Sequence, residues 1–344
     1  MIQTFHATSL PIPHPLNGFT AAQAAFTVQT MHLPDAGISV VSDVVALGRG
    51  PLSAGGSYRK ECFSQDDGAA AFRRRRKHWR LALERLVQSR CELREPTVWI
   101  TDDWSFGYFH WMCDALPRLE MVAREFDLAD LTLVLPHKAT RFDFITESLK
   151  AFPLAGVRLL GRFQSARCRE MVLPTHVATS GNYRPELMDA IRSRCWRHVE
   201  VKDRQPASER VFISRRNATR RRLINETDLR AVLVNHGIRI IETDRMAWAD
   251  QVKLFATTRQ LVSLHGAGLT NMLFMPPGGD VVEIRDPVEP TSNCYLTLAG
   301  VCGHRIAYVD SAKRDSRSTH HADVTIQPAD LDRRLDELAT AKAA

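Results

Sequence analysis

The sequence lacks the cysteine patterns that build disulfide frameworks or zinc sites. Its seven cysteines, at positions 62, 91, 113, 168, 195, 294 and 302, are odd in number and scattered, and they are never spaced as CxxC or interleaved with histidines at zinc-ligand spacing. This distribution argues against a disulfide-rich secreted domain and a zinc finger. We therefore expect free thiols in a reducing, cytoplasm-like compartment.

Long apolar runs are absent as well. No stretch approaches eighteen apolar residues, and the first eighteen residues have neither a basic start nor an apolar run of seven or more. We therefore expect no membrane span, no secretory signal and a cytoplasmic location.

Several motifs that define common functional classes are also missing. The chain has no GxGxxG fingerprint, no P-loop and no serine elbow, and no helix-turn-helix, zinc knuckle or RNP-like segment is visible. These absences argue against a dinucleotide-binding protein, a nucleoside triphosphatase and a serine hydrolase. The lack of a nucleic-acid motif weakens that class too.

Positive charge is present in excess. The 344 residues include 46 Lys and Arg against 39 Asp and Glu, which gives a net charge of +7, and most of the cations are arginines. Because the planar guanidinium group binds phosphate bidentately, an anionic partner is one interpretation. An arginine-rich composition without functional meaning is the other.

Hydrophobic periodicity predicts an α/β chain. The first seventy residues resemble short strands and turns, residues 69–90 have the periodicity of a basic helix, and apolar strands then alternate with helical stretches from about residue 97. We predict two Rossmann-like domains with an interdomain cleft. The expected boundaries are an N-terminal acceptor-side domain with a β-rich beginning at 1–200, a linker at 201–209, a C-terminal domain at 210–312, and a tail with an amphipathic helix at 313–344.

A glycine-rich loop in the second half predicts an anion site. His265, Gly266, Ala267 and Gly268 follow the apolar stretch "QLVSL" and precede the helix-like run "LTNMLF". Backbone N–H groups at a helix N-terminus favour negative charge, and glycine lets a phosphate approach closely. A purely structural strand-to-helix turn is the alternative.

An arginine-rich loop follows another strand of the same predicted sheet. "VFISRRNATRRRLINE" places Arg215 and Arg216 directly after a strand, with three further arginines before the next helix. The carboxyl ends of parallel strands share one edge, so this loop and the glycine-rich loop should face one opening. We expect Asn225 to cap the following helix. Glu283, at the end of "DVVEI", either accepts hydrogen bonds from a ribose or is a surface carboxylate paired with Arg285.

A second candidate site lies in the first half. In "DDWSFGYFHWMCDALPRL", His110 and Asp114 are four residues apart and share a helix face, an arrangement suited to a general base. Trp104 and neighbouring aromatic residues suit a sugar ring, although they also suit a core. Pro117 is expected to kink the helix one turn later.

Three motifs in this order resemble glycosyltransferase family 61, which includes bacterial capsular-polysaccharide enzymes and eukaryotic xylosyl- and N-acetylglucosaminyltransferases. They are "GYFHWMCDALPRL", "VFISRRNATRRRLINETDL" and "SLHGAGLTNMLFMPPGGDVVEI", within residues 97–285. The resemblance implies a GT-B-like fold, a nucleotide-diphosphate sugar bound mainly by the second domain, and inverting transfer without a metal or other cofactor.

The resemblance also implies roles for individual residues. His110 and Asp114 fall on the acceptor half, with Asp114 as the leading base and the reverse assignment still open. The donor-half motifs contain Arg215, Arg222, Asn225, Glu226, His265, Gly266, Gly268, Asn271 and Glu283. The loop arguments add Arg216 and Ala267 to the donor-binding set.

These observations lead to one principal hypothesis. We expect a hexosyl- or pentosyltransferase that moves a sugar, with UDP as the first choice of nucleotide, to a glycan or lipid-linked saccharide in bacterial surface-polysaccharide synthesis. A non-catalytic protein that binds a nucleotide sugar or nucleic-acid phosphates is the alternative. The basic stretch at residues 73–85 either contacts an anionic membrane surface peripherally or is a solvated helix face.

Overall fold

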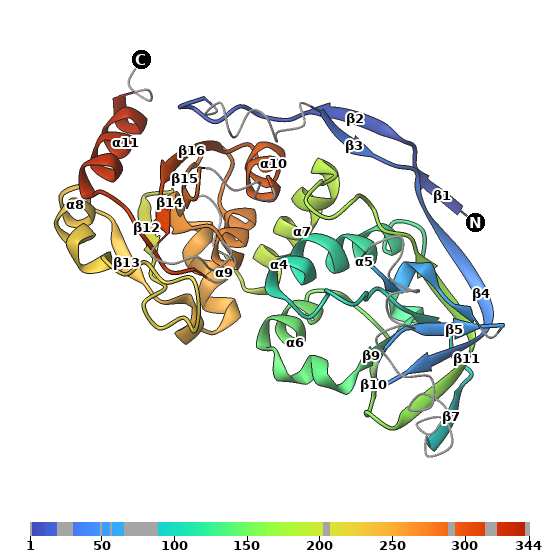
Figure 1. The fold of residues 1–344 in the computed structure, drawn as a ribbon. Helices are drawn as coiled ribbons and strands as arrows, with labels where there is room; N and C mark the ends of the chain where they lie inside the picture. Colours follow the sequence, from blue (N-terminus) through green and yellow to red (C-terminus); the bar gives the residue numbers. More distant parts are fainter. Residues whose placement is uncertain are drawn as a thin grey trace. The chain divides into compact units, whose positions relative to one another are not determined.

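The computed structural model describes residues 2–18, 30–48, 50–55, 57–64, 89–201, 207–287, 293–313 and 322–340 (Figure 1). The chain divides into two compact units. The first comprises Met1–Ser9 and His32–Arg194, and the second comprises Leu10–Met31 and Cys195–Ala344. The predicted domain boundaries stay a prediction, and the basic stretch at 73–85 lies outside the described residues.

The first unit contains a mixed sheet in the order β10-β9-β8-β11-β4-β5-β6, with β1 on β4 and β7 on β11. Strands β7, β8, β9, β10 and β11 run parallel, whereas the twelve-residue β4 pairs antiparallel with β11 and begins the antiparallel part. The predicted α/β class is thus confirmed for the first unit, but because β4 joins it antiparallel, its sheet is mixed rather than the parallel sheet of a Rossmann-like domain. The strands are β1 (Ile2–Phe5), β4 (Ala36–Leu47), β5 (Leu52–Ala54), β6 (Ser57–Tyr58), β7 (Ser89–Leu93), β8 (Thr97–Val98), β9 (Thr132–Pro136), β10 (Gly156–Leu160) and β11 (Gln164–Pro174).

Helices of the first unit bury apolar faces against this sheet. The helical stretch from Tyr108 to Val122 is the most deeply buried of them, with Leu116, Leu119 and Met121 excluded from solvent. The helical elements are η1 (Lys60–Cys62), α4 (Tyr108–His110), η2 (Trp111–Ala115), α5 (Leu116–Val122), η3 (Leu128–Asp130), η4 (His137–Arg141), α6 (Asp143–Leu149) and α7 (Pro185–His198). A separate two-stranded sheet pairs β2 (Thr8–Pro11) with β3 (Thr30–Leu33).

The second unit is built on a five-stranded parallel sheet in the order β13-β12-β14-β15-β16. In chain order this is 2-1-3-4-5, so the connections change direction between β12 and β14. Parallel sheets bind ligands at the carboxyl ends of their strands at such a switch point. The strands are β12 (Glu209–Ile213), β13 (Arg239–Ile241), β14 (Thr258–Leu264), β15 (Asp280–Arg285) and β16 (Arg305–Asp310), with a small antiparallel pair of β17 (Ala312–Lys313) and β18 (Val324–Thr325).

Helices cover both faces of this sheet, as the alternation of strands and helices predicted (Figure 1). The leucines of α8 and α11 pack with Phe212, Val262 and Ile284 in one apolar core. Element η7 contacts α9, α10 and β14, and α10 also contacts β16. The helical elements are η5 (Glu226–Leu229), α8 (Arg230–Asn235), η6 (Thr243–Arg245), α9 (Trp248–Ala256), η7 (Ala267–Phe274), α10 (Cys294–Val301) and α11 (Pro328–Thr340).

Residues near the N-terminus belong to the second unit and line the outer edge of β16. Leu16 N donates to Ile306 O at 2.8 Å, and Tyr308 N donates to Asn17 Oδ1 at 3.0 Å. Pro13 packs against Gly300 of α10, where a Cβ would lie 2.5 Å from its Cγ. This part of the edge strand is therefore covered by the chain itself.

Two further sequence expectations can be compared with the structure. All seven cysteines lie in the described part of the chain, and each is a free thiol. Where the chain is described, none of its helices combines the length and the apolar character that crossing a bilayer requires. The cytoplasmic location stays a prediction.

Candidate functional site

The glycine-rich loop lies at the switch point of the second sheet. It begins at His265, directly after β14, and leads into the 3₁₀ helix η7, while the arginine-rich loop follows the neighbouring β12. The two loops therefore meet at the edge where the sequence predicted an anion site. The first backbone N–H groups of a helix have no partner within it, so this edge supplies donors to a ligand.

Two guanidinium groups lie over the bare Cα of Gly266. A Cβ there would be 3.1 Å from Arg221 Nη2 and 3.3 Å from Arg215 Nη1, so a side chain would displace both groups. The backbone of Gly266, at φ 151° and ψ 179°, is one that residues with a side chain rarely adopt. Arg221 itself has a φ of 55°. Local backbone geometry thus brings two cations to the glycine-rich loop.

Neither of these arginines forms an ion pair with a carboxylate among the described residues. Arg215 donates from Nε to Arg221 O at 3.0 Å and from Nη2 to Arg220 O at 3.2 Å, which orients its guanidinium group. Burial lowers the pKa of Arg215, and the nearby charge of Arg221 lowers it further. Burial also lowers the pKa of Arg221. An anion between the two groups would offset both burial and mutual repulsion.

His265 is oriented by a buried carboxylate on the next strand. Its Nδ1 lies 2.5 Å from Oε1 of Glu283, and its ring packs edge-on against Tyr295 with centroids 5.1 Å apart. Glu283 is only 1% exposed, so its interpretation as a surface carboxylate paired with Arg285 is wrong. Its contact with a ribose stays a prediction. With Nδ1 directed at Glu283, the Nε2 atom of His265 remains for a ligand.

The remaining donor-loop residues stabilise the loop. Glu226 accepts hydrogen bonds from Ser214 Oγ at 2.6 Å and from Arg215 N at 3.3 Å, and so supports the backbone that carries Arg215. The exposed Arg216 pairs with Glu242 at 2.8 Å. Arg222 pairs with Asp323 at 2.9 Å. Their contact with a donor stays a prediction.

Asn225 and Asn271 also have protein partners. The amide of Asn225 donates to Ile326 O and accepts from Ile326 N, at 2.8 and 3.2 Å, so it connects this loop to the segment before α11. Asn225 occupies the N-cap position of η5, as predicted, but its side chain makes no capping bond to that helix. The side chain satisfies a distant backbone pair instead. Asn271 is 1% exposed and donates to Gln251 at 3.3 Å.

The second candidate site begins with a widened helical turn in the first unit. Residues Trp111–Ala115 form a π-helical segment between α4 and α5, directly before Pro117. Proline has no N–H to give to the carbonyl four residues earlier, which favours a local departure from the α-helical ladder. The helix thus continues past Pro117, and the predicted disturbance takes the form of this π turn.

His110 and Asp114 are hydrogen-bonded across this turn. His110 Nδ1 lies 2.7 Å from Asp114 Oδ2, and the same oxygen accepts from Ser180 Oγ at 2.8 Å. A proton on Nδ1 leaves Nε2 of His110 as an acceptor. Trp104 and Phe109 flank the imidazole, each with its ring centroid 5.0 Å away. Trp111, by contrast, is a core residue that donates to Ser148.

A second histidine and aspartate pair lies beyond the carboxyl ends of the parallel strands β8 and β11, and the sequence did not reveal it. His176 follows β11 and Asp102 follows β8, and their Nε2 and Oδ2 atoms are 3.0 Å apart. Burial opposes ionisation of Asp102, but hydrogen bonds from His176 and Ser105 and the charge of Arg118 outweigh it and lower its pKa well below the usual range. A small cavity of about 120 Å³ adjoins Asp102.

One of the missed residues, Asp102, had a signal in the sequence, and another, Arg221, had none. Asp102 comes soon after a short apolar strand, which is where ligand-binding residues of parallel sheets lie. Arg221, which the donor-binding set omitted, is set apart from its neighbours Arg220 and Arg222 by its positive φ and by its position over Gly266. No sequence signal distinguishes one arginine in such a run from the next.

Comparison with known proteins agrees with the motifs. Residues 108–282 match the model of a family described as Glycosyltransferase 61, and this match spans just over half of the chain. It includes both His110 and Asp114 as well as the two loops at the switch point of the second sheet.

Several characterised enzymes are similar to parts of the chain. An EGF domain-specific O-linked N-acetylglucosamine transferase of Drosophila melanogaster is 32% identical over 98 residues, which is 28% of this chain and 18% of the relative. The mouse enzyme of that name is 23% identical over 255 residues, 66% of this chain and 48% of its own. A protein O-linked-mannose beta-1,4-N-acetylglucosaminyltransferase 2 of Takifugu rubripes is 28% identical over 124 residues, 35% of this chain and 21% of the relative. The chain thus spans about half or less of the length of these relatives.

Proposed function

Because this chain belongs to the glycosyltransferase 61 family, we propose that it transfers a sugar from a nucleotide-diphosphate donor to a hydroxyl group of a glycan or lipid-linked saccharide. The prediction of a glycosyltransferase is confirmed at the level of the family. The finer features belong to the proposal: UDP as the nucleotide, inversion without a metal, a GT-B arrangement, and a role in bacterial surface polysaccharides.

The donor side supports this proposal most directly. Arg215 and Arg221 place two guanidinium groups beside the N-terminus of η7, and neither forms an ion pair with a carboxylate of the described residues. A departing diphosphate gains negative charge as the sugar bond breaks, and fixed cations and N–H groups stabilise that charge. In the proposed complex His265 Nε2 hydrogen-bonds the diphosphate as well.

The acceptor side supports base catalysis by a histidine. Asp114 Oδ2 accepts from both His110 and Ser180, and its side chain is less exposed than that of His110, at 10% against 26%. We therefore assign His110 Nε2 as the base that removes the proton of the attacking hydroxyl, and Asp114 as the carboxylate that orients the imidazole. This reverses our expectation that Asp114 is the leading base.

The names of the relatives suggest the transferred sugar. Two kinds of enzyme that differ in their acceptors, one named for EGF domains and one for O-linked mannose, are both named as transferases of N-acetylglucosamine. We therefore propose UDP-N-acetylglucosamine as the first donor to assay. The acceptor is proposed only as a hydroxyl of a saccharide.

Calorimetric titration with a panel of nucleoside diphosphates tests the donor site. We expect Arg215→Gln to weaken UDP binding by about 1.5 to 3 kcal/mol, because it removes a charge-assisted hydrogen bond. Arg216→Gln is the matched control, since Arg216 is exposed and already paired with Glu242. Equal affinities in the wild type and Arg215→Gln would refute the proposed site.

Transfer must then be measured separately from binding. Incubation with UDP-N-acetylglucosamine and a saccharide acceptor should release UDP, and product analysis should show the inverted linkage. Tight binding without either transfer or donor hydrolysis would favour the non-catalytic alternative.

A further inference from the structure

A pocket in the second unit lies at the opposite edge of the sheet from the candidate donor site. It has a volume of about 260 Å³ and lies at the amino ends of β12, β14 and β15, next to α11. About five residues of β14 separate Gln260 from His265, which corresponds to about 16 Å along a strand. The pocket is therefore distinct from the donor site. Its lining residues are Arg210, Arg259, Gln260, Asp280, Leu335, Leu338 and Ala339.

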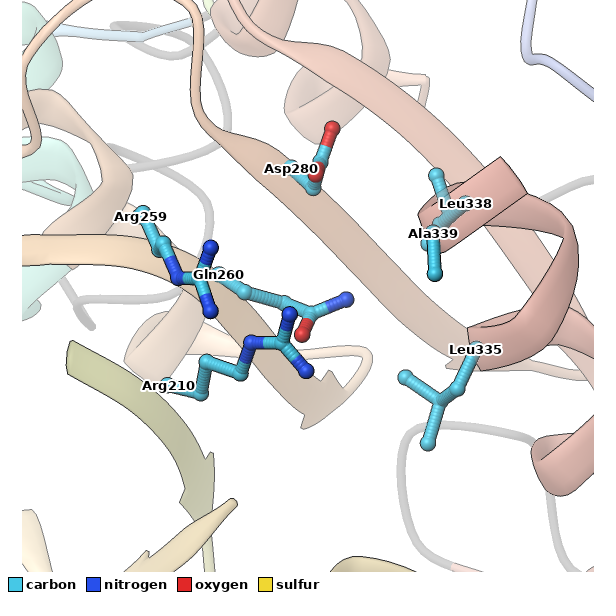
Figure 2. Close-up of a pocket in the computed structure, with 7 residues that line it drawn as sticks. All are labelled: Arg210, Arg259, Gln260, Asp280, Leu335, Leu338 and Ala339. Atoms are coloured by element: carbon cyan, nitrogen blue, oxygen red, sulfur yellow. The ribbon is translucent and has the colours of Figure 1, made fainter. Parts of the chain in front are cut away.

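One wall of the pocket is cationic and the other is apolar. Figure 2 shows the guanidinium groups of Arg210 and Arg259 next to the amide of Gln260, with the side chains of α11 across from them. On that side Leu335, Leu338 and Ala339 present only hydrocarbon. A ligand that fits both walls has a charged end and an apolar end.

A β-bulge directs the second arginine into the pocket. Glu209 pairs with Thr258, and the next residue, Arg210, pairs with Gln260, so Arg259 is the extra residue of the bulge. Consecutive side chains of a regular strand point to opposite faces, whereas a bulge re-aims one of them. Both Arg259 and Gln260 line the pocket for this reason.

The two guanidinium groups have spare hydrogen-bonding capacity. Arg210 donates from Nη1 to His236 O at 2.9 Å, and its buried Nε has no partner among the described residues. Arg259 donates from Nε to Ser208 O at 3.2 Å. Within the described part of the chain neither forms an ion pair, and the nearby Asp280 is paired with Arg305 at 2.7 Å. Burial lowers the pKa of Arg210 and the charge of Arg259 lowers it further, while the carboxylate of Asp280 acts in the opposite direction.

We propose that this pocket binds a phosphate monoester with an apolar substituent, its phosphate against Arg210 and Arg259 and its substituent against Leu335, Leu338 and Ala339. A phosphate monoester carries close to two negative charges at neutral pH, so it balances two guanidinium groups, whereas a carboxylate balances one. Arginine also matches the geometry of phosphate oxygens. This site is independent of the proposed sugar transfer.

Binding of hexyl phosphate to the full chain, measured by calorimetry, tests the proposal. Inorganic phosphate and hexanol, which each lack one half of the probe, should bind more weakly. We expect Arg259→Gln to weaken hexyl phosphate binding between about 10-fold and about 100-fold, because a charge-assisted contact is lost. Ala339→Glu should abolish it by placing a carboxylate at the apolar wall. Arg333→Gln, on the exposed side of α11, is the control and should bind like the wild type.

The variants also show where the probe binds. Thermal denaturation checks that Arg259→Gln and Ala339→Glu remain folded, and unchanged UDP binding shows that their donor site is intact. If hexyl phosphate affinity falls in Arg215→Gln but not in Arg259→Gln, the probe occupies the donor site and the proposal is overturned.

Two sources of such a ligand are separable with vesicles. The wild type would bind the phosphate of a lipid if it co-sediments with phosphatidic acid vesicles but not with phosphatidylcholine vesicles. This co-sedimentation should disappear in Arg259→Gln. Binding of hexyl phosphate without vesicle binding would identify a soluble ester. Failure of the wild type to bind either probe would overturn the site.

Discussion

A methyl group on Gly266 would meet Arg221 Nη2 at 3.1 Å and Arg215 Nη1 at 3.3 Å. At this residue a side chain would strain the backbone and would push against both guanidinium groups. The geometry that makes the loop accessible to an anion is therefore the same geometry that requires glycine.

Gly266→Ala should weaken UDP binding and destabilise the fold by about 1 to 3 kcal/mol, the typical cost of a strained backbone angle. Gly278→Ala is the matched control, because Gly278 also has a positive φ, 86°, but faces open space. Urea denaturation and calorimetry measure the two effects. The control should lose stability while keeping its UDP affinity, and a Gly266→Ala chain with wild-type affinity would contradict the role of the arginine pair.

The two members of the His110 and Asp114 pair should differ in their contribution to catalysis. His110→Ala should lower kcat by about 10² to 10⁴, the range typical of general base catalysis, while leaving UDP affinity unchanged. Asp114→Asn should cost less, because it removes only the group that orients the imidazole. Steady-state kinetics at saturating donor measure both. A larger loss in Asp114→Asn than in His110→Ala would return the base to Asp114.

For single residues, the sequence showed which side chains could belong to the site more reliably than it showed which groups they contact. Spacing along a helix was enough to pair His110 with Asp114, because residues four apart are neighbours on any helix. Glu283 and Asn225 could not be interpreted in that way. Their partners, His265 and Ile326, are 18 and 101 residues away, and only the tertiary fold brings them together.

At the scale of elements, the C-terminal helix shows a clear match between pattern and packing. The sequence predicted an amphipathic helix, and α11 buries Leu331, Leu335 and Leu338 against the core of the second unit. The same helix forms the apolar wall of the pocket in Figure 2. The periodicity was visible in the sequence because it is a local property.

Leu331→Ala should destabilise the chain by about 2 to 5 kcal/mol, because it leaves a cavity at a fully buried position. Arg333→Ala, two residues further along the helix on an exposed side chain, should change the stability by less than about 0.5 kcal/mol. Urea denaturation of both variants provides the comparison. Equal effects would show that α11 does not depend on its buried face.

Local patterns did not reveal how some elements are joined. The long antiparallel pairing of β11 with β4 joins residues more than a hundred positions apart, such as Ala166 and Ala46. Alternation of apolar residues identified β4 as a strand but said nothing about its neighbour. The π turn is similar, since Pro117 indicated a disturbance without specifying its form.

At the scale of the whole molecule, buried ion networks make stability depend on pH. The pKa of Asp102 is lowered in the folded chain, chiefly by His176 and Arg118 acting against burial. Its unfolded value is about 3.9. Ionised Asp102 therefore stabilises the fold fully above about pH 4, and this contribution is lost as the pH falls toward the folded pKa.

Asp102→Asn should accordingly lower the unfolding free energy at pH 7 by about 1.5 to 3 kcal/mol, since a buried hydrogen bond to a charged group is lost. The difference from the wild type should shrink below about pH 4, where the aspartate of the unfolded wild type becomes protonated. Urea midpoints measured from pH 7 to pH 3.5 follow this change. If the unfolding free energies of the wild type and Asp102→Asn differ by the same amount at every pH in this range, the charge of Asp102 does not contribute to stability.

The segment near the N-terminus has a consequence for how copies of this protein meet. Outermost strands usually present unpaired amides and carbonyls that can nucleate intermolecular sheet growth. Leu16 and Asn17 already occupy such groups on β16 at Ile306 and Tyr308. This flank is thereby protected against self-association, and the protection comes from residues nearly three hundred positions away in the chain.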